Sequence, residues 1–401
     1  MFGKIKRVIA GVLSSAMVLS CAGCNFGEDT AVALTVDGYE IKAGVYIWHS
    51  INSLEEAKNK AAGINKDLDV EDEEALKATK LDGMEFMNYV KDQTTDECIQ
   101  HVTILRQFDE LGLSFTEAEQ NDIDAYVDGY WDAYGKSLTE NGIGEESLYE
   151  IQEMTYKAEK VFEAYYGEGG SEGIKEETIK DYYVENNARV RYIDLDLHDT
   201  EGNELDEAGK EELRDMAEDF KKRASKAKND TEMLELFNEF QEEYDDYVYG
   251  ATLEAAGEEV PEEVVTTAPE ETGDETTTTT TTSPYTNEVV VPVVKTEEGT
   301  HEDEVTYTPS KACYDWIFND AKTGVPEIVE DEDTIYVIVR FDIEERMTED
   351  DLWNETVSDN VRWTMYYEEF EDVIQAIAET LEVVKNEDAY DRYDPFEINI
   401  E

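Results

Sequence analysis

The sequence of 401 residues predicts an α+β protein that is mostly helical. Apolar residues recur at helical spacing in several long segments, which is the pattern of amphipathic helices. Two segments, 188–197 and 334–341, instead alternate or are dense in β-branched residues, as strands are. The chain is 40% hydrophobic and has 24 Tyr, 13 Phe and 5 Trp, so enough apolar surface is present to form a core.

The N-terminal segment, residues 1–23, has the pattern of a secretion signal: basic residues within 4–7, then an uncharged apolar run from 8 to 19. That run is shorter than the ~20 apolar residues that a membrane-spanning helix needs. The residues after this run resemble the lipobox of bacterial lipoproteins, with Cys24 as the acylated residue and Cys21 as the alternative. We therefore expect a lipid anchor on the outer face of the cell membrane, as in a Gram-positive bacterium.

The charge balance excludes one class of partner. The chain has 100 Asp and Glu against 33 Lys and Arg, a net charge of −67. Such a chain repels the phosphates of nucleic acid, so no nucleic-acid partner is expected. In one interpretation the negative charge keeps the protein soluble. In another it attracts basic unfolded polypeptides or cations.

The first half of the chain reads mainly as helices. Asp37-Gly38 lies between apolar runs and predicts a hairpin over 34–41. A helix follows from Ala43, whereas the acidic segment 65–82 is expected to be a loop or loose helix. Thr116 and Glu119 form a capping-box signature. The remaining helices are expected at 96–111, after Thr116, at 145–166 and at 174–185.

In the second half, the alternation over 188–197 predicts a strand with Val190, Tyr192, Asp194 and Asp196 on one face. A turn at 199–203 and helices at 205–227 and 231–244 come next. The acidic, Thr-rich segment 254–304 predicts a disordered linker, in which Val289–Val294 could form an edge strand broken by Pro292. The rest reads as a helix at 310–320, two short strands ending with 334–341, a long helix at 349–384 and a loose tail after 386.

This order of elements resembles the PrsA/SurA-type extracytoplasmic foldases, through the hairpin VDGYEI, the phrase DELGLSFTEAE and the strand region IKDYYVENNARVRYIDLDL. The resemblance implies a small parvulin-like peptidyl-prolyl isomerase domain set within a helical chaperone module. We predict that the two parvulin-like parts pack together across the linker. The implied divisions are a tether at 24–33, the chaperone domain at 34–187, the parvulin-like parts at 188–253 and 305–346, a returning helix at 347–385 and an acidic tail at 386–401.

The resemblance also locates the candidate catalytic positions. Active parvulins carry a histidine in the first strand and another in the last. Here the first strand has Tyr192, and the last has Ile335 and Tyr336. A tyrosine can donate a hydroxyl proton but cannot relay protons as an imidazole does. We therefore expect a chaperone that assists exported, unfolded polypeptides, with a parvulin-like domain that lacks full isomerase activity. An active isomerase with a rearranged site, and a non-catalytic surface-binding or spacer lipoprotein with a glycosylated linker, are the alternatives.

An aromatic face on one predicted helix is the candidate client-binding surface. It comprises Tyr126, Tyr130, Trp131 and Tyr134. These side chains either pack the helices together or form a cradle for unfolded chains, because tyrosine combines an apolar ring with a polar tip.

The other groups of polar residues and cysteines predict no functional site. His49 and His101 are expected to be packed or solvated helix residues, and no histidine pair has metal-ligand spacing, so neither a metal nor a cofactor is predicted. The acidic segment 194–207 fails the EF-hand pattern and reads as strand, turn and helix. Cys98 and Cys313 permit a disulfide, although two buried free thiols are the preferred interpretation.

Overall fold

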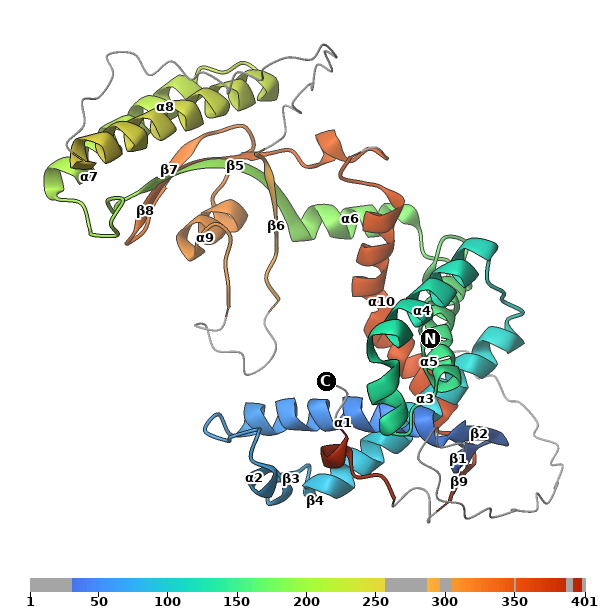
Figure 1. The fold of residues 1–401 in the computed structure, drawn as a ribbon. Helices are drawn as coiled ribbons and strands as arrows, with labels where there is room; N and C mark the ends of the chain where they lie inside the picture. Colours follow the sequence, from blue (N-terminus) through green and yellow to red (C-terminus); the bar gives the residue numbers. More distant parts are fainter. Residues whose placement is uncertain (1–30, 257–286, 296–304, 350, 387–391, 399–401) are drawn as a thin grey trace, which may run out of the picture. The chain divides into compact units, whose positions relative to one another are not determined.

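The computed structural model describes residues 31–256, 287–295, 305–349, 351–386 and 392–398. The chain divides into two compact units, one formed by Met1–Glu172 with Tyr366–Glu401 and the other by Gly173–Met365. Both units combine helices with small antiparallel sheets (Figure 1), so the predicted α+β, mostly helical class is confirmed.

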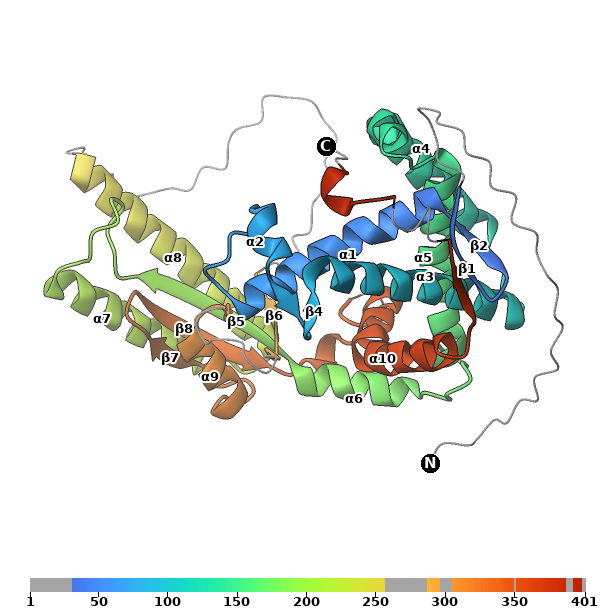
Figure 2. The ribbon, with the colours of Figure 1, turned by 90° about the horizontal axis from the view of Figure 1, so that it is seen from below.

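The first unit is built on long helices. Two of them, α1 and α3, lie side by side (Figure 2), with Leu54 and Ala57 of α1 buried against Val90 of α3. The helices are α1 (Ala43–Ile64), α2 (Glu73–Lys77), α3 (Phe86–Glu110), α4 (Glu117–Glu140), α5 (Glu145–Tyr166) and the C-terminal part of α10 (Glu355–Ala378).

A three-stranded sheet ties the two ends of this unit together. Its order is β2-β1-β9, with β1 at Val32–Val36, β2 at Tyr39–Lys42 and β9 at Val383–Lys385. The predicted hairpin is confirmed: Asp37 has φ +46° and Gly38 has φ +87° in the turn. The prediction of a helix up to 384 is wrong at both ends, because α10 spans Glu355–Ala378. Beyond it the chain pairs with β1, and Glu382 accepts a hydrogen bond from the Asp37 amide at 2.7 Å.

The segment 65–82 is more ordered than its composition predicts. It contains α2 and leads into a second hairpin, β3 (Lys80–Leu81) with β4 (Met84–Glu85). The turn is again Asp-Gly with positive φ at both residues, 50° at Asp82 and 84° at Gly83. The following helix begins at Phe86, ten residues before the predicted start, because the fully buried Phe86 belongs to the core around Leu81.

Two other predicted helices are confirmed closely. The Thr116 side chain accepts a hydrogen bond from the Glu119 amide at 3.2 Å, while the Glu119 carboxylate accepts one from the Thr116 amide at 2.7 Å. This capping box begins α4. Helix α5 has the predicted bounds, and Gly167 follows its last residue.

The tail was expected to be loose, and for residues 392–398 that expectation is wrong. Tyr393 lies 6.2 Å from Tyr46, measured between ring centroids, and Phe396 lies 6.0 Å from Phe86. Phe396 is part of the short 3-10 helix η3 (Pro395–Glu397). The tail is held because it supplies aromatic rings to the core of this unit.

The second unit is organised around a four-stranded antiparallel sheet of order β6-β5-β8-β7. Helices α7 and α8 cover one face, and α9 lies on the other (Figure 1). Its elements are α6 (Glu176–Asn186), β5 (Asn187–Asp196), α7 (Glu207–Ala224), α8 (Asp230–Ala256), β6 (Val289–Pro292), α9 (Lys311–Asn319), β7 (Glu327–Glu330), β8 (Thr334–Phe341), η2 (Glu344–Arg346) and the N-terminal part of α10.

The alternation along β5 divides the core as predicted. Ile193 and Leu195 pack beneath α7 and α8, whereas Val190 and Tyr192 pack with α9. Strand β5 pairs with β8 from Arg189 to Asp196. The segments 188–253 and 305–346 therefore form one unit, which confirms that they pack together across the intervening residues.

The two compact units divide the chain at other points than the predicted domains do. The second unit begins at Gly173 and includes α6, where Tyr183 packs against Trp353 with ring centroids 5.4 Å apart. Within the segment 254–304, α8 extends to Ala256, and the predicted edge strand is present as β6, which ends at Pro292. Residues 257–286 and 296–304 lie outside the described residues.

Candidate functional site

The two candidate catalytic positions meet on the α9 face of the sheet. Tyr192 of β5 pairs with Ile338 of β8, and Tyr336 lies two residues away along β8, so both tyrosines project from the same face. Their ring centroids are 6.0 Å apart at an interplanar angle of 75°. Cys313 of α9 is buried in the same cluster. Two positions that the sequence separates by more than a hundred residues are thus in contact.

The electrostatics of this cluster limit its chemistry. Burial raises the pKa of both Tyr192 and Tyr336, and Asp194 adds to the shift at Tyr192. Burial also raises the pKa of the Cys313 thiol to about 12. All three groups are therefore protonated at neutral pH. They can donate hydrogen bonds, but the thiol is not a nucleophile and none of the three is a general base.

The described histidines lie elsewhere. His49 and His101 belong to the first unit, and His198 follows β5. The Asp196 carboxylate lies 2.9 Å from His198 Nδ1. His198 lines a cavity of about 310 Å³ between the 198–205 loop, α7 and α8, together with Leu213 and Tyr244. The strand–turn–helix interpretation of 194–207 is confirmed, with the helix α7 capped by Asp206.

In the first unit, the four aromatic candidates on α4 divide into two pairs. Tyr126 and Tyr134 are 47% and 44% exposed. Tyr130 lies between them, stacked on Tyr126 at a centroid distance of 5.9 Å and tilted against Tyr134 at 4.8 Å, and it also contacts Trp48 at 6.0 Å. Trp131 is partly buried in the core and lies against its own helix. Packing therefore accounts for Tyr130 and Trp131, whereas Tyr126 and Tyr134 present an aromatic surface to solvent.

Trp131 occupies its position because the residue one turn further along α4 is a glycine. A Cβ atom built on Gly135 would lie 2.8 Å from the indole ring, closer than van der Waals contact allows. Sequence reasoning treated Trp131 like the tyrosines around it. The glycine four residues later was the signal that this ring packs inward.

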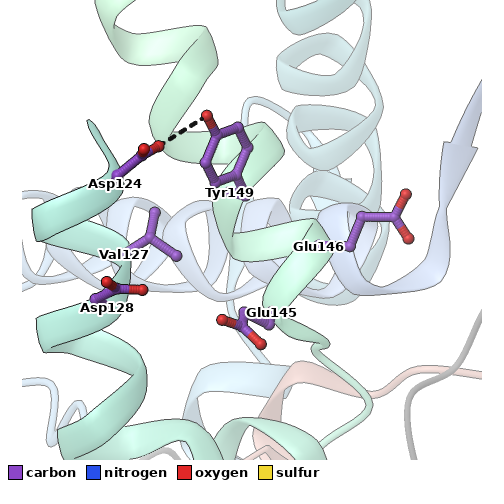
Figure 3. Close-up of a pocket in the computed structure, with 6 residues that line it drawn as sticks. All are labelled: Asp124, Val127, Asp128, Glu145, Glu146 and Tyr149. Atoms are coloured by element: carbon purple, nitrogen blue, oxygen red, sulfur yellow. Dashed lines mark hydrogen bonds between the residues drawn. The ribbon is translucent and has the colours of Figure 1, made fainter. Parts of the chain in front are cut away.

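An acidic pocket of about 590 Å³ opens between α4 and α5 (Figure 3). Tyr149 forms one wall, and its hydroxyl donates a hydrogen bond to Asp124 at 3.1 Å. No lysine or arginine is among the residues that line it, so the pocket suits a cationic group better than an anion. The lining residues are Asp124, Val127, Asp128, Glu145, Glu146 and Tyr149.

His49 and His101 are in contact. The sequence predicted each of them only as a packed or solvated residue of its own helix. Their Nε2 and Nδ1 atoms are 3.2 Å apart, and both rings are buried. Polar residues on the otherwise apolar faces of two long helices were the signal for this contact, since buried polar groups need partners. Within the described part of the chain, no group of three or more His, Cys, Asp or Glu side chains could hold a metal ion.

The remaining predicted residues have simple outcomes. Cys98 and Cys313 are free thiols and are buried, which confirms the preferred interpretation. Cys24 and Cys21 lie outside the described residues. A search of the described helices finds none that is both long and apolar enough to cross a membrane. No protein-family model, curated protein or solved structure matches this chain.

Proposed function

We propose that this protein is a lipid-anchored chaperone that holds unfolded polypeptides on the outer face of the membrane, with a parvulin-like domain that does not catalyse prolyl isomerisation. The observation that carries the proposal is the contact between Tyr192 and Tyr336. They stand where the foldase resemblance places catalytic histidines, and both hydroxyls remain protonated at neutral pH. The site can donate hydrogen bonds but has no imidazole for proton relay.

The sheet supports the parvulin-like part of the proposal. The resemblance implies a domain that ends in a helix, a glycine turn and two strands. Helix α9, the turn at Gly324 with φ +72° and the strands β7 and β8 follow in that order. The first and last strands of the domain, β5 and β8, are neighbours in the centre of the sheet.

The aromatic surface of α4 supports the chaperone part. Tyr126 and Tyr134 expose large rings on α4, the helix that also contributes Asp124 and Asp128 to the carboxylate-lined pocket. Exposed aromatic rings favour apolar side chains of a client, and the carboxylates favour basic ones. The net charge of −67 favours the same clients, because long-range attraction accelerates their association.

A test of client binding uses the purified full-length protein and an aggregation-prone client diluted from urea, with light scattering as the readout. We expect wild type to suppress aggregation and the Tyr126→Ser/Tyr134→Ser double variant to lose most of that effect. Tyr249→Ser is the matched control, since Tyr249 is 51% exposed on α8. Full suppression by the double variant would exclude this surface. A protein that never suppresses aggregation but binds one envelope component would be a surface-binding lipoprotein instead.

A proline-limited refolding assay tests the catalytic part. We expect no acceleration by wild type. Acceleration that Tyr192→Phe or Tyr336→Phe abolishes would show an active isomerase with a rearranged site. The anchor is tested separately by metabolic labelling with a radioactive fatty acid: Cys24→Ser should abolish labelling, and Cys21→Ser should retain it.

A further inference from the structure

Two glutamates and two histidines form a continuous chain through the first unit. Glu97 Oε2 lies 2.9 Å from His49 Nδ1, His49 Nε2 lies 3.2 Å from His101 Nδ1, and His101 Nε2 lies 3.6 Å from Glu150 Oε1. The side chains of His49 and His101 are 6% and 0% exposed. The chain joins helix α1, which carries His49, to α3, which carries Glu97 and His101, and to α5, which carries Glu150.

The four side chains make three contacts, but the two neutral histidines carry too few protons to place a hydrogen bond in each contact. Carboxylates only accept hydrogen bonds, so each of the three contacts needs one proton on a ring nitrogen. Two neutral histidines carry two such protons. The unfilled contact is at the Glu150 end, because His101 Nε2 is buried without a hydrogen-bond partner and its distance to the carboxylate is the longest of the three.

The charge of Glu150 makes this unfilled contact unfavourable. Burial opposes ionisation, but contacts to His101 and a 2.9 Å hydrogen bond from the Tyr39 hydroxyl outweigh it, and the pKa of Glu150 is lowered. An ionised oxygen therefore faces the lone pair of a neutral ring. A proton added to either ring removes this repulsion, because the hydrogen bonds can shift along the pair until His101 donates to Glu150.

The surrounding groups set the pH at which this happens. Burial lowers the pKa of His101 and the Glu150 carboxylate opposes this shift, whereas His49 and Lys157 of α5 add to it. Lys42 of β2 helps to keep Glu150 ionised, whereas Glu56 of α1 lies close enough to Glu97 to interact with it. The neighbouring Cys98 is neutral, because burial raises the pKa of its thiol. Burial therefore favours the neutral form of the His101 ring.

We propose that the Glu97–His49–His101–Glu150 chain is a proton-operated contact, in which one proton taken up by the histidine pair forms the missing hydrogen bond between α3 and α5. Helix α5 also holds α4, through the hydrogen bond from Tyr149 to Asp124. The proton therefore decides whether His101 donates a hydrogen bond from α3 to α5, the helix that supports the aromatic surface. This proposal about proton uptake is independent of the proposed client binding, and it holds whether or not the protein binds clients.

The test follows the ring nitrogens of the full-length protein, labelled with ¹⁵N-histidine, from pH 8 to pH 4.5. Variants His49→Gln and His101→Gln assign the signals. We expect the two rings to take up one shared proton within this range, because they lie 3.2 Å apart and a second proton would place two positive charges in contact. In Glu150→Gln the amide can donate to His101 Nε2 and fill the contact without a proton, so both rings should stay neutral across this range.

A matched control and a second variant make the outcome decisive. Glu145→Gln removes the same charge from an exposed position on α5 and should titrate like wild type. Glu97→Gln supplies an amide donor at the other end of the chain and should also abolish uptake, so a failure of Glu150→Gln to fold leaves the test intact. Wild-type rings that titrate independently, or stay neutral to pH 4.5, would overturn the proposal, as would Gln variants that titrate like wild type.

Discussion

Glu288 precedes the edge strand β6 and is held in the interior of the second unit by two arginines. Its side chain is 1% exposed, and its Oε1 atom lies 2.8 Å from Arg189 Nε and 2.7 Å from Arg189 Nη2. Its Oε2 atom contacts Arg346. We predict that Glu288→Gln strongly destabilises this unit, because it removes the carboxylate charge but keeps nearly the same volume.

The magnitude depends on the groups that still surround Arg189. The side chain of Arg189 is 2% exposed, and after the substitution Glu345, at 3.7 Å and 58% exposed, still pairs with it. Removing one partner of a buried ion pair typically costs about 3–5 kcal/mol. The Asp342 carbonyl, at 3.0 Å, and the Phe341 ring, at 4.8 Å, still contact the guanidinium, so we expect the lower end, about 3 kcal/mol.

The measurement is urea unfolding of the full-length protein. Unfolding is monitored by tryptophan fluorescence, in variants that retain Trp316 and Trp353 as reporters. The matched control is Glu330→Gln, which breaks the pair with Arg214 at 2.7 Å where both side chains are 38% exposed. We expect the control to lose less than about 1 kcal/mol, as exposed pairs do. Equal losses for the two variants would refute the argument from burial.

Three further predictions concern the first unit. Gly38→Ala should destabilise it by roughly 1–2 kcal/mol, because φ is +87° there and no atom crowds the site, so the loss is backbone strain measurable by urea unfolding. Thr116→Ala should cost about 1 kcal/mol through the lost cap of α4, with Thr364→Ala, whose hydroxyl bonds its own helix, as the smaller comparison. Because burial lowers the pKa of His101, the unfolded chain binds that proton at higher pH than the folded chain does. The stability of wild type relative to His101→Gln should therefore be constant above about pH 6.5 and fall below it by up to about 1.4 kcal/mol per pH unit. A difference that stays constant to pH 5 would contradict this.

Local signals in the sequence were sufficient wherever a few adjacent residues decide the conformation. Asp37-Gly38 predicted its hairpin because both residues tolerate positive φ. Thr116 and Glu119 predicted the start of α4 because each satisfies a backbone amide of the other. The period of two along β5 predicted which residues share a face, and the structure covers one face with α7 and α8 and the other with α9. The same chemistry at Asp82-Gly83 was equally readable and gives the second hairpin.

The mostly helical α+β class, most of the helices and the strands of the larger sheet could thus be predicted from the sequence. The contacts between distant segments could not be predicted from the sequence. Examples are β9 with β1, Phe396 with Phe86, and Glu288 with Arg189. Packing also divided the aromatic residues of α4 into exposed and buried ones and brought His49 against His101. These contacts join residues far apart along the chain. Their partners depend on how whole helices and strands pack, which no short stretch of residues encodes.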